Sequence, residues 1–188
     1  MNEESANALL KVMEEQPEGV LFLLTADSLA GVLPTIRSRC VSFAVAPVSP
    51  ADCARYCAAQ GVDPKDAALY SELFDGHIGT VLTAARDDVR REQVEKALTL
   101  AKAAASQDSY AAAVLLSAYE KDKAGAVALL RDFRAVAAAG LRQSPRSPLQ
   151  GDAARKALGA ADAAIQRIRA QVNPKIVLSV LAAKFRSF

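Results

Sequence analysis

Apolar residues recur at helical spacing through most of the chain. Ala6, Leu9, Leu10 and Met13 fall at i, i+3, i+4 and i+7, which predicts an amphipathic helix over residues 2–15. From residue 48 onward the pattern predicts eight more helices, three short and five longer. Their approximate ranges are 50–60, 64–74, 78–86, 88–105, 109–119, 122–141, 152–171 and 174–188.

Three of these helices begin with the same device. Ser49-Pro50, Asp63-Pro64 and Asn173-Pro174 each pair a capping side chain with a proline, and proline is favoured at the first helical position. Gly61 follows the first of these helices as its predicted C-terminal stop.

Two short apolar runs have a different pattern. Residues 20–24 (VLFLL) are continuously apolar, as in a strand buried on both faces, and residues 41–45 (VSFAV) alternate. Thr25 and Asp27 follow the first run, and Asp27 is the predicted cap of a short helical turn. One βαβ unit is too little for a sheet. We therefore predict that residues 1–46 end a larger α/β domain.

Composition places the chain among ordinary soluble globular proteins, with 52% hydrophobic and 23% charged residues. It has no run of about 18 apolar residues that would span a bilayer and no basic-then-apolar leader. We predict a cytoplasmic protein that makes no membrane contact. An odd number of cysteines, Cys40, Cys53 and Cys57, favours reduced thiols over a disulfide framework.

Charge is distributed unevenly along the chain. Residues 1–130 carry 12 basic and 18 acidic side chains, whereas residues 131–188 carry 11 basic and three acidic ones. The basic C-terminal part could contact nucleic acid or pack against an acidic neighbour, in the same chain or another.

Most candidate chemistry can be set aside. None of the nine glycines fits the phosphate-binding motif G-x-x-x-x-G-K-[ST]. Cys53 and Cys57 could share a metal, but a structural zinc site needs four ligands and His77 is the only histidine. His77 has no nucleophile arranged with it, so we interpret it as a cap or surface residue.

The stretch TIRSRC, residues 35–40, remains. It places Arg37 and Arg39 between the two predicted strands. A planar guanidinium suits phosphate when it is presented from a rigid edge. A phosphate-directed arginine in a chain without its own phosphate site suggests a finger supplied to another protein. The alternative is that both arginines are simply solvated.

Three stretches resemble the AAA+ clamp-loader subunits of bacterial DNA polymerase III: NALLKVMEE (residues 7–15), FLLTAD (residues 22–27) and LPTIRSRC (residues 33–40). The resemblance implies that Thr25 occupies the sensor-1 position. It also implies that Arg39, flanked by Ser38 and Cys40, reaches the ATP site of a neighbouring subunit. Motor subunits carry a sensor-2 arginine near the third lid helix, but GHIGT (residues 76–80) has none before Arg86. That departure favours the non-hydrolysing δ′ type over γ/τ.

The fold class implied is mainly α, with three domains. Residues 1–46 would end an AAA+ α/β domain, residues 47–87 would be a three-helix lid, and residues 88–188 would be a helical collar. The collar would join γ/τ and δ subunits, and the complex would act on the sliding clamp and primed DNA. This chain itself would bind no cofactor, because partner subunits hold the ATP, and it would not be an enzyme. A truncated γ/τ-type ATPase and a free-standing helical DNA-binding module remain alternatives.

Overall fold

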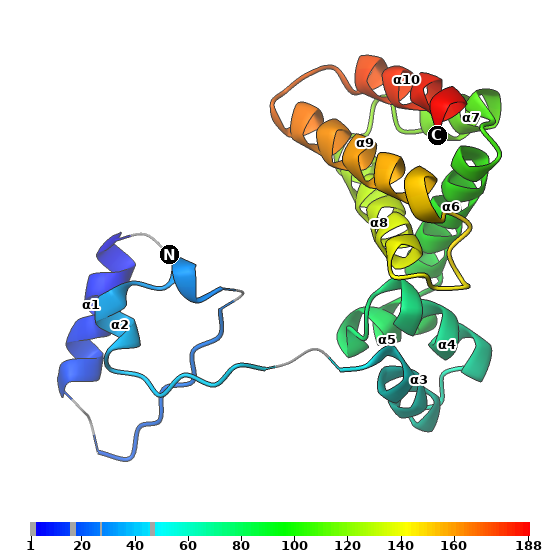
Figure 1. The fold of residues 1–188 in the computed structure, drawn as a ribbon. Helices are drawn as coiled ribbons and strands as arrows, with labels where there is room; N and C mark the ends of the chain where they lie inside the picture. The colour runs from blue at the N-terminus through cyan, green and yellow to red at the C-terminus, as the bar shows by residue number, and fades with distance from the viewer. Residues whose placement is uncertain (1–2, 16–17, 27, 46–47) are drawn as a thin grey trace. The chain divides into compact units, whose positions relative to one another are not determined.

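All regular elements in the described part of the chain are helical. The computed structural model describes residues 3–15, 18–26, 28–45 and 48–188, and it divides the chain into two units, residues 1–46 and 47–188 (Figure 1). The mainly helical prediction is confirmed. The two units are described separately below.

The first unit contains α1 (Glu3–Glu15), the 3-10 turn η1 (Leu29–Gly31) and the short helix α2 (Pro34–Arg37). α1 confirms the first predicted helix. Ser28 caps η1, its hydroxyl accepting a hydrogen bond from the backbone N–H of Ala30 at 3.2 Å. Asp27, the predicted cap, lies outside the described residues.

The two predicted strands are wrong for this unit. Residues 20–24 and 41–45 have no regular secondary structure, and their apolar side chains face solvent: Leu21 is 82% exposed and Phe43 84% exposed. A strand needs neighbouring strands to pair its backbone and covering layers to bury its faces. The described residues of this unit provide neither, so the α/β end of the fold class stays a prediction.

The second unit begins with α3 (Pro50–Ala59), α4 (Pro64–Leu73) and α5 (Ile78–Arg86). The predicted starts are confirmed, since Ser49 accepts a hydrogen bond from Asp52 N–H at 3.1 Å and Asp63 accepts one from Lys65 N–H at 2.8 Å. Gly61 follows α3 with a φ of +86°, a conformation that glycine adopts without strain.

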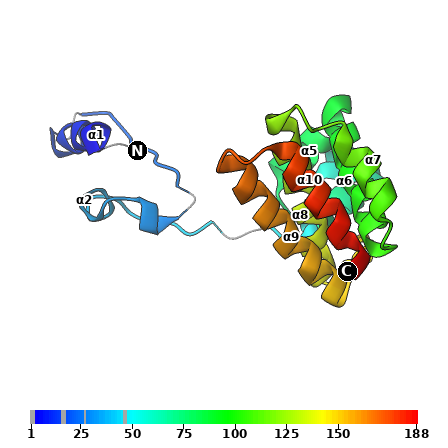
Figure 2. The ribbon, with the colours of Figure 1, turned by 90° about the horizontal axis from the view of Figure 1, so that it is seen from above.

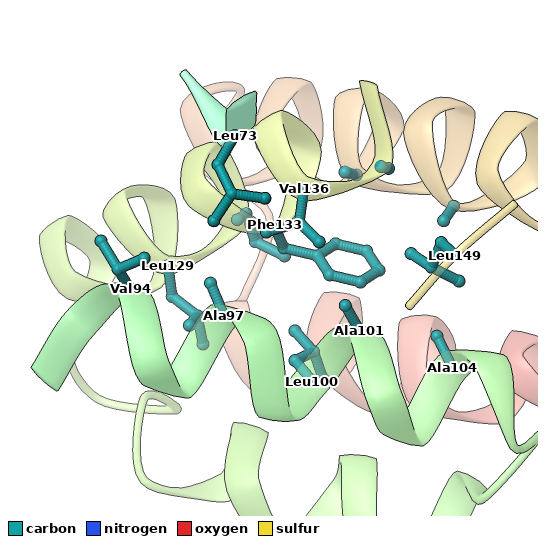
Figure 3. Close-up of a cluster of buried hydrophobic side chains, with 14 of the residues drawn as sticks. Leu73, Val94, Ala97, Leu100, Ala101, Ala104, Leu129, Phe133, Val136 and Leu149 are labelled. Carbon is teal, nitrogen blue, oxygen red and sulfur yellow. The ribbon is translucent and has the colours of Figure 1, made fainter. Parts of the chain in front are cut away.

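The remaining five helices follow in the predicted order, and α7, with nine residues, is as short as α5. They are α6 (Asp88–Ala105), α7 (Ser109–Ser117), α8 (Lys123–Leu141), α9 (Gly151–Arg169) and α10 (Pro174–Lys184), followed by the turn η2 (Phe185–Ser187). α8 packs against α6 and α9, while α10 packs against α7 and α9 (Figure 2). Phe133 of α8 is fully buried and lies near Leu100 and alanines of α6 and near Leu149 (Figure 3). Alanine on the facing sides lets the helices approach closely around a few large side chains.

Arginines join the three short helices to the longer ones. Arg90 of α6 makes a two-pronged ion pair with the buried carboxylate of Asp132 in α8, with 2.6 Å between Nη2 and Oδ1, and lies over the Phe74 ring. Arg142, which follows α8, donates a hydrogen bond of 3.1 Å to the Glu72 carbonyl. That carbonyl lies at the C-terminal end of α4. These contacts hold α3–α10 together as one unit, and the division into lid and collar stays a prediction.

The connection between α8 and α9 crosses α8 at very short range. Leu149 is fully buried, and the Ser147 hydroxyl donates to the Val136 carbonyl at 2.8 Å. At Gly140 a Cβ atom would lie 2.0 Å from the Leu149 carbonyl oxygen. Only glycine therefore fits where the connection crosses the helix.

Candidate functional site

The turn that carries the predicted site is a single turn of helix. Pro34 stands at the start of α2, and the backbone N–H groups of Ser38 and Arg39 bond to the Pro34 and Ile36 carbonyls at 3.0 and 3.1 Å. Ile36 is 2% exposed and anchors the turn. The residues on either side of Ile36 consequently face outward, and they include both arginines.

Arg39 is held by contacts within its own unit. Its Nη2 donates to the Glu14 carboxylate of α1 at 2.6 Å, and its Nη1 donates to the Thr35 carbonyl at 3.0 Å. The Arg39 side chain remains 41% exposed and that of Glu14 55% exposed. The guanidinium is thus oriented without being buried, and an anion can still reach it from solvent.

Glu14 is a site residue that the sequence analysis missed. It lies 25 positions before Arg39 and belongs to α1, which packs against α2 (Figure 1). No local spacing connects the two residues. Only the resemblance places NALLKVMEE and LPTIRSRC in one family motif, and it assigns no role to the glutamate.

The other predicted residues have simpler surroundings. Ser38 donates to the Thr35 carbonyl at 3.0 Å and so helps to close the turn, while Cys40 is partly buried. Arg37 and Thr25 are exposed, and Thr25 lies in the irregular segment before η1. The structure therefore brings Ser38 and Arg39 together at one turn, whereas the Thr25 hydroxyl makes no hydrogen bond with the described residues.

Cys53 and Cys57 are buried one turn apart in α3. Burial, with a smaller contribution from neighbouring Cys53, raises the pKa of Cys57 from 9.0 to about 11, which keeps the thiol protonated and unreactive. Within residues 3–15, 18–26, 28–45 and 48–188, no group of three or more histidine, cysteine or acidic side chains is placed to hold a metal. We therefore interpret Cys53 and Cys57 as two buried, protonated thiols of the helix core.

Two further residues considered in the sequence analysis, His77 and Arg86, lie at the two ends of α5. His77 is exposed at the N-cap of α5 and makes no side-chain capping bond. Arg86, the first arginine after the expected sensor-2 position, donates to the Gln60 carbonyl at 2.9 Å. That carbonyl lies at the C-terminal end of α3, so Arg86 serves to join two helices of the bundle.

A shallow hollow of about 310 Å³ lies between α7 and α10. Its polar lining consists of Ser117, Glu120 and Ser179, with apolar residues for the rest. A single carboxylate beside two hydroxyls provides no base paired with a nucleophile. Among the described helices, none is both long and apolar enough to cross a membrane.

The second unit is thus a helical bundle held together by arginine contacts, and the first presents an oriented, solvent-accessible arginine on a turn. Residues 1–49 match the family described as DNA polymerase III, delta subunit.

Curated relatives agree with this match. A DNA polymerase III subunit delta' from Haemophilus influenzae is 55% identical over 40 residues, which are 21% of this chain and 12% of that protein. The Pseudomonas aeruginosa subunit delta' is 37% identical over 86 residues, 46% of this chain and 26% of that protein. The Yersinia pestis subunit delta' is 41% identical over 56 residues, 30% of this chain and 16% of that protein.

The matched stretches thus span between 12% and 26% of the length of these relatives. No solved structure matches the chain. The matches nevertheless point to one family, and they confirm the predicted resemblance to DNA polymerase III subunits of the δ′ type.

Proposed function

We propose that this chain is the C-terminal part of a δ′-type clamp-loader subunit that does not hydrolyse ATP. Arg39 acts in a neighbouring subunit's ATP site, where its guanidinium stabilises charge on the transferred phosphate. ATP is held by the γ/τ-type partners and not by this chain. The helices α6–α10 form the collar that joins those partners and δ, and the assembly loads the sliding clamp at primed DNA.

The observation that carries this proposal is the state of the Arg39 side chain. The Arg39 guanidinium donates to two acceptors, the Thr35 carbonyl and the Glu14 carboxylate, which orient it. Its side chain is nevertheless 41% exposed. The Arg37 side chain, two residues earlier, is exposed and makes no hydrogen bond or ion pair with the described residues. An arginine that acts in trans must be both positioned and accessible, because its phosphate is provided by another subunit.

Arg86 supports the δ′ type over an ATPase of the γ/τ type. A sensor-2 arginine has to reach the nucleotide of its own subunit, whereas Arg86 is committed to the end of α3 through the Gln60 carbonyl. All three curated relatives also have δ′ in their names. An upstream G-x-x-x-x-G-K-[ST] in the natural gene would instead favour the γ/τ type.

The test is Arg39→Ala in the full-length subunit, reconstituted with its partner subunits, the clamp and primed DNA. Arginine fingers contribute roughly 10³-fold or more to phosphoryl transfer. We expect a loss of that order in DNA-stimulated ATP hydrolysis at the site Arg39 serves, with unchanged assembly by size-exclusion chromatography.

Arg37→Ala is the matched control, since it removes the same side chain from the same turn. It should leave hydrolysis within about twofold of the parent complex, a difference that corresponds to roughly 0.4 kcal/mol. Unchanged hydrolysis in Arg39→Ala would show that the finger is not used. Equal losses in both variants would show that the turn has a structural role.

A further inference from the structure

One side of the second unit is strongly basic. Arg131 and Arg134 are exposed on α8, and Lys184 is exposed on α10. α9 adds four more exposed basic side chains: Arg155, Lys156, Arg167 and Arg169. We call these seven side chains the basic face.

The tertiary structure makes this face continuous. α9 packs against both α8 and α10 (Figures 1 and 2). The Arg134–Asp162 ion pair, 2.6 Å long, joins the outer sides of α8 and α9. On the other side of α9, Arg167 and Lys184 line one shallow depression with Ala163 between the helices. The seven cations therefore lie across three neighbouring helices on one side of the bundle.

Folding also removes acidic charge from this side. Of the three acidic residues after position 130, Asp132 is buried and bound by Arg90. Asp152 and Asp162 remain: Asp152 pairs with Arg155 and Lys156, and Asp162 pairs with Arg134. Two carboxylates against seven exposed cations still leave an excess of positive charge on this side. The face is therefore more positive than the net charge of +2 for the whole chain suggests.

The kind of partner follows from what the face lacks. α9 exposes no large apolar side chain, and the depression beside Lys184 adds one, Val180 of α10, which is 40% exposed. Protein interfaces generally bury a core of several apolar and aromatic residues. Single-stranded nucleic acid is usually bound by stacking its bases on aromatic rings, and α9 contains none. A polar surface of arginine and lysine over small residues fits the phosphates of a duplex.

The dimensions agree with that partner. Lys156 and Arg167 lie eleven residues apart on the same side of α9, which at 1.5 Å per residue is about 16 Å. One strand of a DNA duplex carries a phosphate for about every 3.4 Å of helix axis, so this row spans several phosphates. We propose that the basic face binds the phosphate backbone of duplex DNA without reading its sequence, independently of the arginine that the proposed function uses.

The test uses the 188-residue chain and a fluorescent 20-base-pair duplex of arbitrary sequence, with anisotropy measured over a range of salt concentrations. The test variant replaces Arg155, Lys156, Arg167 and Lys184 with glutamine. Each lost phosphate contact flattens the slope of log K against log salt by about 0.9, so the four together are expected to flatten it by about 3.6.

A matched control replaces four exposed cations elsewhere in the same unit with glutamine: Arg55, Lys65, Lys102 and Lys121. Both variants lose the same net charge, so the control should keep the parent's slope to within about one contact. Circular dichroism establishes that all three proteins are equally folded.

Three outcomes would overturn the inference. The parent chain could fail to bind the duplex, or both variants could lose binding equally, which would show that net charge alone is responsible. Thirdly, polyglutamate and unlabelled duplex could be compared as competitors at equal concentrations of negative charge. If polyglutamate displaced the labelled duplex more effectively, the basic face would be assigned to an acidic protein. None of these results depends on ATP hydrolysis, so failure here leaves the role of Arg39 untouched.

Discussion

The ion pair between Arg90 and Asp132 provides a sharp test of how the second unit is held together. It connects α6 with α8 and places the guanidinium over Phe74 at the end of α4, 5.7 Å from the ring centre. Hydrogen bonding to Asp132 raises the pKa of Arg90 above its usual value, so the arginine stays charged. Asp132→Ala removes the carboxylate and leaves that charge without its partner.

The size of the effect follows from burial. The Asp132 side chain is 8% exposed and that of Arg90 22% exposed. Breaking a buried ion pair from one side costs about 3–5 kcal/mol, because the remaining charge has lost its compensation. Arg90 retains some access to water, so we expect a loss of about 2–4 kcal/mol in unfolding free energy.

The control is another arginine–aspartate pair in the same bundle. Arg134 and Asp162 are 50% and 44% exposed, and exposed pairs contribute about 0.2–1 kcal/mol, so Asp162→Ala should cost no more than that. Urea denaturation followed by circular dichroism measures both variants, with equal m-values required for the comparison. Equal losses in the two variants would refute the reasoning from burial.

A double variant separates the pair's own contribution from the penalty of an orphaned charge. Arg90→Met with Asp132→Leu replaces both charges with apolar side chains and should recover most of the stability lost in Asp132→Ala. A double variant as unstable as the single one would show that the hydrogen bonds themselves are required.

Two further predictions concern packing and thiol chemistry. Gly140→Ala should lower the unfolding free energy by about 1–3 kcal/mol, because the new Cβ collides with the Leu149 carbonyl. Gly159→Ala should raise the unfolding free energy by about 0.5–1 kcal/mol, because nothing lies within 4 Å of its new Cβ. Thermal denaturation measures both, and a stabilised Gly140→Ala would contradict the close approach. Because the pKa of Cys57 rises from 9.0 to about 11 on folding, the unfolded chain loses this proton first. Stability should therefore fall as pH rises from about 9 to 11, and Cys57→Ala should show a smaller fall in urea titrations across that range. An unchanged pH dependence in Cys57→Ala would show that Cys57 is not the group responsible.

Local sequence determined where the helices begin and end. Serine, aspartate or asparagine followed by proline specified three helix starts, and the side chains of Ser49, Asp63 and Asn173 make the expected capping bonds. Such caps depend only on residues within one turn, so periodicity and capping are enough to recognise them. The same local reasoning failed for residues 20–24 and 41–45, because a strand depends on partners elsewhere in a fold.

The candidate site divides in the same way. The resemblance at the SRC triplet predicts Arg39 from the sequence, whereas Glu14, which pairs with it, is found only through the packing of α1 against α2. Likewise, the sequence contains the excess of basic residues after position 130, whereas folding buries Asp132 against Arg90 and places the outer sides of α8, α9 and α10 next to one another. The sequence alone determines helix boundaries and total charge, since these are local or additive. Which charges are paired and which remain exposed is decided by contacts between residues tens of positions apart, so only the tertiary structure reveals it.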